Sequence, residues 1–210
     1  MTILALEFSS ERRSVALARA GAVLAEAVQQ DGSRGTNALG LIGRVLAESN
    51  IAREEIEVIA VGLGPGSYTG IRAAIAVAQG WQLARGVKLL GVSSAEALAA
   101  QAQADNLLGT VDVVIDAQRG EFYLATWEIS AVERKETSSL KIVSGGEIKA
   151  RQATGRICVG PLMNKAMFPA AATIAGLAAQ RTDFIPGDEL VPIYLRETTF
   201  VKAPIGKTLS

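Results

Sequence analysis

A strand that runs directly into a glycine-rich loop and then into an apolar helix is the feature that most limits how this chain can fold. Residues 57–63 form a continuous apolar run, residues 64–70 (GPGSYTG) follow at once, and residues 71–85 have the composition of a helix. A short apolar run bounded by turn residues is typical of a buried strand. The pattern therefore predicts an α/β protein in which a mixed sheet carries helices.

The segments around this unit extend the same pattern over the first half of the chain. Apolar runs separated by short turns indicate an antiparallel meander, and a later Ala-rich stretch begins with Ser93 and Glu96 at the spacing of a capping box. The further predicted elements are strands at residues 2–8, 14–20 and 23–29, a helix at 36–49 ending near Asn50, a strand at 89–92 and a helix at about 93–104. The predicted order is βββαβαβα.

The second half of the chain is shorter and less regular. We expect a hairpin around the turn at residues 117–120, and polar, helix-capable segments between the later strands. The predicted elements are strands at residues 111–116, 121–128, 141–143 and 157–159, a helix at 173–181 and a mostly extended tail at 186–210, whose role is open. Two lobes are expected, a larger one at residues 1–106 and a smaller one at 107–210.

Composition excludes several kinds of chemistry. The 210 residues contain no histidine, which rules out Ser-His-Asp and Cys-His nucleophile systems and any histidine-containing metal site. The single cysteine, Cys158, forbids an internal disulfide and is expected to be an inert thiol. The 21 basic residues balance the 21 acidic ones, so the chain lacks the overall positive charge of a protein that grips nucleic acid alone. With no signal peptide or membrane span in view, we expect a cytoplasmic protein that does not bind membranes.

The glycine loop admits two interpretations. Glycines at the start of a helix let backbone amides approach an anion, so Gly64, Gly66, Ser67 and Gly70 are candidates for a phosphate cradle. The loop is neither a Walker motif nor the dinucleotide fingerprint, because no Gly-Lys-Ser/Thr follows and the third glycine comes one residue late. From these residues alone, a tight turn that packs the helix closely on its strand is favoured.

Two helices are candidates for a protein interface. Residues 71–78 leave almost no polar face over two turns, and such a helix is buried either in the domain or against a partner. We favour a partner, with Trp81 as an aromatic anchor, because an outer-layer helix of so small a domain normally shows solvent a polar stripe. The helix at residues 36–49 has its own apolar stripe. The candidate contact residues are Leu39, Ile42, Val45 and Leu46 from one helix and Ile71, Ala74, Ala78 and Trp81 from the other.

Two acidic positions are interpreted as structural rather than catalytic. Glu7, at the end of the first strand, occupies the place where actin-like ATPases carry an aspartate that holds metal and phosphates, but glutamate is longer and Phe8 replaces a small residue. We interpret Glu7 as part of a strand end and turn. Asp116 with Arg119 and Glu121 around a hairpin turn is interpreted as a local ion pair. No catalytic residue, metal site or cofactor is expected.

Several blocks of this sequence, in order, resemble the TsaB family, which was once labelled glycoprotease-like. The opening hairpin, the glycine loop with its helix, a mid-chain block and an ending block all have counterparts, and they cover nearly the whole chain. They are residues 3–7 (ILALE), 14–17 (SVAL), 64–72 (GPGSYTGIR), 76–80 (AVAQG), 115–123 (IDAQRGEFY) and 192–196 (PIYLR).

The resemblance implies a two-lobed actin/Hsp70/sugar-kinase-like (ribonuclease H-like) fold. It also implies a non-catalytic scaffold that docks through helices of its first lobe on TsaD, the catalytic relative, and acts with the ATPase TsaE. Together these proteins place threonylcarbamoyl on the adenosine next to the anticodon of transfer RNA, and RNA is met only through the complex. Alone, such a chain is expected to form a homodimer.

The chain departs from the family pattern in two places. Residues 33–36 (SRGT) lack a histidine that is common before the first helix, and Glu7-Phe8 replaces the usual Asp-Thr. Both departures weaken nucleotide or metal binding, and neither harms a scaffold. The glycine loop is then a vestigial phosphate loop. The alternative function is an actin-like ATPase or small-molecule kinase using Glu7 and the glycine loop. A peptidase is disfavoured, because the sequence shows no histidine, no metal motif and no nucleophile–base pair.

Overall fold

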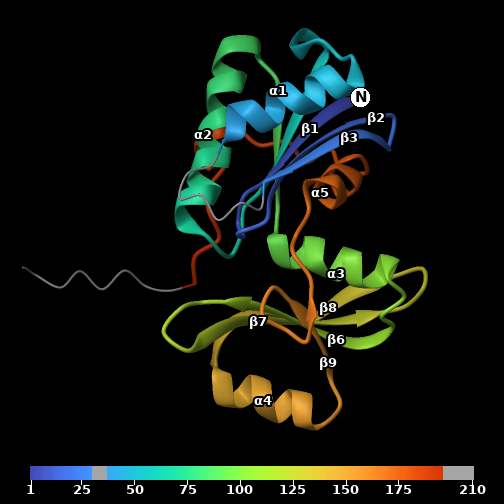
Figure 1. The fold of residues 1–210 in the computed structure, drawn as a ribbon, viewed down its shortest axis with the longest axis vertical. Coiled ribbons are helices and arrows are strands. Elements are labelled where there is room, and N and C mark those ends of the chain that lie inside the picture. Colours follow the sequence, from blue (N-terminus) through green and yellow to red (C-terminus); the bar gives the residue numbers. More distant parts are fainter. Residues whose placement is uncertain (30–36, 196–210) are drawn as a thin grey trace, which may run out of the picture.

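The chain folds into two lobes, each built on one five-stranded sheet (Figure 1). The computed structural model describes residues 1–29 and 37–195. The first sheet has the order β3-β2-β1-β4-β5 and the second the order β10-β9-β6-β7-β8. The strands are β1 (Thr2–Glu7), β2 (Arg13–Arg19), β3 (Ala22–Gln29), β4 (Val58–Gly62), β5 (Lys88–Val92), β6 (Gly109–Asp116), β7 (Glu121–Ile129), β8 (Arg134–Ser144), β9 (Ile157–Gly160) and β10 (Lys165–Ala166).

The second sheet repeats the topology of the first. In each, three strands form an antiparallel meander, a helix follows, and the fourth strand then pairs in parallel with the first strand of the meander. The fifth strand pairs in parallel with the fourth. This duplicated ribonuclease H-like unit confirms the expected actin/Hsp70/sugar-kinase-like fold class.

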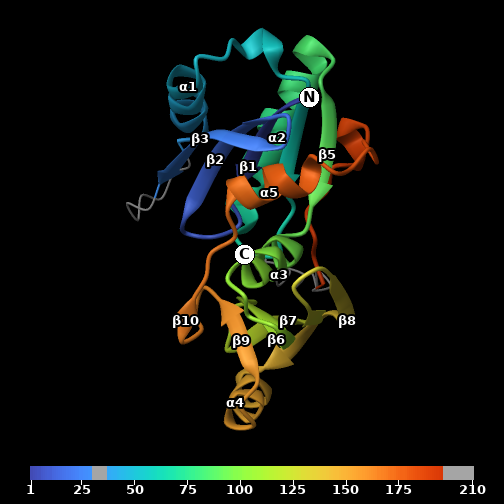
Figure 2. The ribbon, with the colours of Figure 1, turned by 90° about the vertical axis from the view of Figure 1, so that its right-hand side faces the viewer.

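Helices cover the sheets in layers (Figures 1 and 2). Helices α1 and α2 lie on one face of the first sheet, α5 lies on its other face, α3 lies between the two lobes, and α4 packs on the second sheet. Their bounds are α1 (Ala38–Ser49), α2 (Tyr68–Arg85), α3 (Ser94–Ala104), α4 (Gly145–Ala153) and α5 (Ala171–Ala178), with short 3-10 turns η1 (Arg53–Glu55) and η2 (Gly187–Glu189). Within residues 1–29 and 37–195, no helix is long and apolar enough to span a membrane.

Strand β1 explains why the first sheet needs helices on both faces. Its side chains alternate, so that Leu4 and Leu6 join the core under α1 and α2 whereas Ile3 and Ala5 join the core under α5. All of them are buried. A central strand that is apolar on both faces must be covered on both sides.

The chain returns to the first lobe after completing the second sheet. Helix α5 packs against β1 and β2, and the backbone N–H of Ala171 donates a hydrogen bond to Ser14 Oγ (2.8 Å). Further on, Ile185 forms an isolated bridge with Leu89 of β5. The crossover into the second sheet follows α3, and residues 171–195 then return to the layers of the first lobe. The reason is non-local: the far face of the first sheet needs an apolar cover. The division between residues 106 and 107 stays a prediction.

Several element ends differ from the sequence prediction. Helix α2 begins at Tyr68 rather than residue 71, because the Ser67 side chain accepts a hydrogen bond from Gly70 N and acts as its N-cap. Strand β8 spans Arg134–Ser144, far longer than the predicted 141–143. Ser93 is the N-cap of α3, as predicted, and its side chain accepts a hydrogen bond from Ala95 N. The Glu96 carboxylate lies 4.0 Å from the Arg181 guanidinium.

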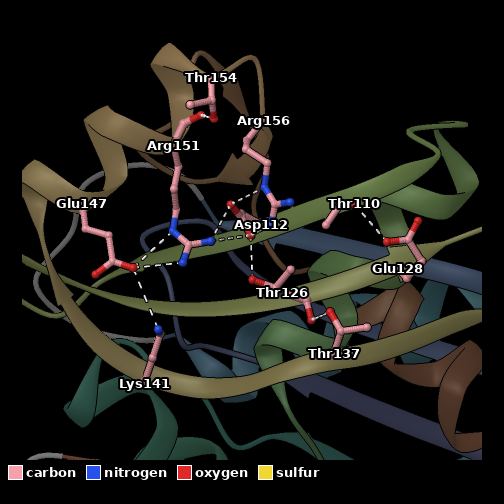
Figure 3. Close-up of polar contacts among 10 residues, drawn as sticks. All are labelled: Thr110, Asp112, Thr126, Glu128, Thr137, Lys141, Glu147, Arg151, Thr154 and Arg156. Carbon is pink, nitrogen blue, oxygen red and sulfur yellow. Dashed lines mark hydrogen bonds and ion pairs between the residues drawn. The ribbon is translucent and has the colours of Figure 1, made fainter.

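A buried ion-pair network fixes α4 to the second sheet (Figure 3). Asp112 of β6 is fully buried, and its carboxylate lies 3.3 Å from Arg151 of α4 and 3.1 Å from Arg156. The Thr126 hydroxyl is the third donor to this carboxylate (2.7 Å), and Arg151 also contacts Glu147 (2.9 Å). Burial raises the pKa of Asp112, but the hydrogen bonds from Arg156 and Thr126 and the nearby positive charges outweigh it, and the net pKa is lowered.

Cys158 lies beside this network, since Asp112 and Cys158 are partners in the β6–β9 pairing. Burial, and then the negative charge of Asp112, raise the pKa of the Cys158 thiol. A raised pKa keeps the thiol protonated and poorly nucleophilic. This environment is consistent with the inert thiol that the sequence predicted.

Replacing Asp112 by Asn is expected to destabilise the protein by about 3 kcal/mol at neutral pH, because two guanidinium groups lose their shared anion. A lowered folded-state pKa means that this contribution is present above the unfolded-state pKa of Asp and is lost as pH falls through the folded-state value. Urea unfolding of wild type and Asp112→Asn at neutral and strongly acidic pH measures the difference. The difference in unfolding free energy between the two proteins should be smaller at acidic pH.

The control for this prediction is Asp105→Asn, which removes an exposed pair with Lys165 (3.1 Å). Exposed pairs contribute about 0–1 kcal/mol, so this variant should unfold almost like wild type. If Asp112→Asn were equally mild, the network would not anchor α4.

Candidate functional site

The glycine loop packs against the end of β1. Gly64 and Gly66 have φ values of +85° and +149°, which only glycine adopts readily. A Cβ atom on Gly66 would collide with the carbonyl oxygen of Ser9, and one on Gly70 would collide with that of Phe8. The favoured sequence interpretation, close packing of helix on strand, accounts for these glycines.

The donors of this loop are turned toward the chain itself. The backbone N–H of Ser67 donates to the carbonyl oxygen of Ser9 (2.6 Å), and the N–H of Gly70 donates to Ser67 Oγ (3.4 Å). These two amides of the expected phosphate cradle therefore already have partners. A vestigial phosphate-binding role for Gly64, Gly66, Ser67 and Gly70 stays a prediction.

Glu7 is fully buried at the junction of β1, the glycine loop and α3. Its Oε1 accepts a hydrogen bond from Ser9 N (2.6 Å), and its Oε2 accepts one from the Ser94 hydroxyl at the start of α3 (2.8 Å). A Cβ atom on Gly62 would collide with Oε2, so the neighbouring strand is shaped around the carboxylate. Burial raises the pKa of Glu7, and the hydrogen bonds from Ser9 and Ser94 partly oppose that rise.

This environment does not suit a metal ligand. Both oxygens of Glu7 are engaged by the chain, in a site shaped around the carboxylate and closed to solvent. In the part of the chain that the structure describes, no three His, Cys, Asp or Glu side chains gather closely enough to hold a metal ion. The residues present therefore fit the structural interpretation of Glu7 better than the metal site of an ATPase.

A cleft of about 560 Å³ lies between the lobes and in front of the glycine loop. The β1–β2 turn and the loop contribute Ser9, Ser10 and Tyr68, and the second lobe contributes Asp116 and Tyr123. This is the cleft that the alternative function, an actin-like ATPase, would require.

The β6–β7 turn at the edge of this cleft is held locally. Asp116 accepts hydrogen bonds from the backbone N–H (2.8 Å) and the side-chain amide (2.7 Å) of Gln118. The ion-pair partner expected from the sequence was Arg119, but the Asp116 carboxylate stabilises the turn through Gln118.

The predicted interface residues divide into two groups. Ile42, Val45, Ile71, Ala74 and Ala78 are buried in the core beneath α1 and α2 and cannot contact a partner directly. Leu39 is 76% exposed, and Leu46 and Trp81 are partly buried against that core. The correction has a simple cause: the apolar row that periodicity finds on each helix is the row that covers the sheet.

The outward face of α1 and α2 includes Leu39, which the sequence predicted, and other residues that sequence reasoning missed. It is small or apolar along much of its length, and Leu83 is 91% exposed. We call this set the docking face: Leu39, Gly43 and Ala47 of α1 with Ala76, Gly80 and Leu83 of α2, all exposed. The signal that reveals Ala76 is the uncharged, small or apolar run at residues 73–78 of α2, whose outward position can be identified once the inward row has been assigned.

Several known proteins are similar to this chain in sequence. A family model described as TsaD, tRNA N6-adenosine threonylcarbamoyltransferase, matches residues 19–154. The tRNA threonylcarbamoyladenosine biosynthesis protein TsaB of Escherichia coli is 34% identical over 128 residues, which are 61% of this chain and 55% of that protein. TsaB of Bacillus subtilis is 30% identical over 61% of this chain and 56% of its own length. The chain thus spans just over half the length of these curated relatives.

Two further comparisons cover more of the molecule. An uncharacterized protein of Mycobacterium tuberculosis is 30% identical over 72% of this chain and 69% of its own length. The solved structure of YeaZ from Pseudomonas aeruginosa superposes with a TM-score of 0.77 at 26% identity, covering 92% of this chain and 99% of that one.

Replacing Glu7 by Gln should remove a pH dependence of stability. Because the folded-state pKa is raised above the unfolded value, the stability of wild type is fully present below the unfolded pKa and falls as pH rises through the folded value. Gln keeps an oxygen acceptor and does not titrate. Melting temperatures across acidic to mildly alkaline pH should show the variant gaining on wild type as pH rises. A variant that instead loses stability at alkaline pH would show that the ionised carboxylate is required.

Proposed function

The chain belongs to the TsaD family (tRNA N6-adenosine threonylcarbamoyltransferase) as a member of its TsaB type, and from that premise we propose that it is a non-catalytic subunit of the enzyme that makes threonylcarbamoyladenosine in transfer RNA. It binds a TsaD-type partner, which carries the catalytic site, through the docking face. TsaE acts with the pair, and RNA is bound only by the assembled complex. Without the partner, the same face joins two copies of this chain.

The observation that carries this proposal is the pair of exposed glycines inside the two helices. Gly43 of α1 and Gly80 of α2 each have open space where a Cβ atom would lie, so the packing of this chain does not require glycine at either position. Glycine within a helix costs about 1 kcal/mol relative to Ala. Small residues allow another helix to approach closely, and a docking partner accounts for a cost that the isolated fold does not explain.

The surrounding apolar surface supports the same role. Leu39 and Leu83 are among the most exposed large apolar side chains of the described residues, and both lie on this face. Exposed apolar side chains on two neighbouring helices are typical of a protein interface. Burial of these leucines by a partner gives the complex a favourable hydrophobic contribution.

Activation follows from preferential binding. A subunit that binds only the active conformation of its partner shifts the partner toward that conformation by the difference in binding free energy. The chain itself then needs no reacting group. The closed environment of Glu7 and the internally bonded amides of Ser67 and Gly70 agree with that role.

The alternative function is an actin-like ATPase or small-molecule kinase. One observation favours it: the interlobe cleft of about 560 Å³, which both lobes line. Against it stand Glu7, which is closed to solvent, and the loop amides, which already have partners.

Ala76→Glu is expected to weaken binding to the TsaD-type protein of the same organism by at least about 100-fold, because it places a long carboxylate side chain, which must lose its water, where two chains pack closely. Ala76 is exposed, so the isolated chain should remain folded. Calorimetry or light scattering of the mixture measures the loss, and circular dichroism checks the fold.

Two matched variants complete this test. Ala74→Glu, two residues away and fully buried, should unfold the isolated chain rather than act on binding. Ala150→Glu, at an exposed position of α4 in the second lobe, should change neither property. Undiminished binding by Ala76→Glu would contradict the proposed docking face.

Titration of the isolated chain with magnesium-ATP separates the two functions. Because the loop donors and Glu7 are engaged internally, we expect no saturable heat of binding and no release of phosphate. Saturable binding with turnover by this chain alone would favour the kinase-like enzyme over the scaffold.

A further inference from the structure

Two separate parts of the sequence meet in one aromatic cluster at the N-terminal end of α2. Tyr68, from the glycine loop, and Tyr194, from the segment that follows η2, have ring centroids 5.3 Å apart and an interplanar angle of 34°. Arg72, one turn along α2, donates a hydrogen bond to the Tyr68 hydroxyl, and its guanidinium lies 5.2 Å from the centroid of that ring. The rings remain half-exposed, at 50% for Tyr68 and 45% for Tyr194.

The segment that carries Tyr194 is held on α2 by polar contacts. Gly187 is clamped by the side chains of Gln79 (2.7 Å) and Gln82 (2.9 Å), and Ile193 N donates to the Leu63 carbonyl oxygen (2.9 Å). The position of Tyr194 is therefore fixed by backbone hydrogen bonds and not only by its ring contact. Less conformational entropy is lost on binding when such side chains are already ordered.

The cluster borders a small groove that continues onto the docking face. The groove has a volume of about 300 Å³ and is lined by Tyr68, Arg72, Ala76, Gln79 and Tyr194, among others. Ala76 is also a residue of the docking face. A partner that covers Ala76 therefore reaches Arg72, which lies one turn away on the same side of the helix.

The charge of Arg72 is uncompensated. Within residues 1–29 and 37–195, no carboxylate forms an ion pair with this guanidinium, and its contacts are those with Tyr68. By contrast, the other arginines on these helices are paired: Arg44 lies 3.7 Å from Glu48, and Arg85 lies 3.4 Å from Glu54. A guanidinium that becomes buried in an interface needs an anion, since burying an unpaired charge is costly.

We propose that Tyr68, Arg72 and Tyr194 form an anchoring site for a carboxylate side chain, Asp or Glu, on the docking surface of the TsaD-type partner. This inference rests on the proposed function and assigns the charged contact within it. Arginine favours carboxylates because its fork of donors can bind both oxygens, and the tyrosine rings exclude water from the pair.

Single-stranded RNA is the other ligand that stacked aromatics and arginine can bind. Two observations favour the protein carboxylate. Among the residues that the structure describes, Arg72 is the one cation lining the groove, whereas phosphate tracks are usually followed by several, and the groove is continuous with the apolar docking face. The chain as a whole carries no net positive charge.

The test compares Arg72→Met, Arg72→Lys and the control Lys149→Met for binding to the TsaD-type protein at low and high salt. Met keeps the length and helix propensity of the side chain without its charge. We expect Arg72→Met to weaken binding about 10- to 100-fold at low salt and to reduce its salt dependence, with Arg72→Lys intermediate. Lys149 is exposed on α4, so its variant should bind like wild type.

The outcomes separate this inference from the proposed function. If Arg72→Met binds the TsaD-type protein as tightly as wild type does, the anchoring site is overturned but the scaffold role is not. If Arg72→Met leaves binding to the protein partner unchanged but the assembled complex binds transfer RNA more weakly, the carboxylate site is overturned in favour of an RNA site. Absence of any complex with wild type overturns both.

Discussion

The buried carboxylate of Glu7 is the contact on which the relative placement of three elements depends. One oxygen fixes the turn after β1 through Ser9 N, and the other fixes the start of α3 through the Ser94 hydroxyl. The glycine loop then docks on that same turn, through the hydrogen bond from Ser67 N to the Ser9 carbonyl oxygen. Because α3 lies between the two sheets, the same carboxylate links the first strand to the helix that leads into the second lobe. Removing a carboxylate from water is costly, and it is tolerated here because each oxygen has a donor.

This arrangement also explains how a nucleotide-type loop can serve a structural purpose. A loop that presents amides at a helix N-terminus attracts anions only while those amides lack partners. In this chain the Ser67 amide binds the Ser9 carbonyl oxygen, and the glycines give the close approach that this contact needs. The glycine loop keeps the shape of a cradle, while its geometry holds α2 in place. Helix α2 in turn presents the docking face.

The sequence predicted much of the fold and little of the site. The sequence pattern located all three strands of the first meander and the main helices, because their apolar runs or stripes are separated by turn residues. It missed most of β8, whose polar residues lie on a sheet edge, and it could not foresee that α5 returns to the first sheet, since that contact joins residues far apart in sequence. Several residues predicted to lie in the interface are buried in the core, and the reason is different. A helix of small apolar residues looks the same on its inward and outward rows, so Ala74 and Ala76 are distinguishable only once the sheet beneath α2 is placed.

That similarity of the two rows has a functional consequence. A helix that served only the monomer would gain solubility from polar residues at Ala76, Gly80 and Leu83. On the proposed function, these positions stay small or apolar because another chain covers them. One face can be covered by one chain at a time, so self-association and binding to the TsaD-type partner are mutually exclusive. The balance between them is then set by concentration and by the difference in affinity. A contact that the partner makes and a second copy does not, such as a carboxylate against Arg72, is the kind of difference that directs this balance toward the heteromeric complex.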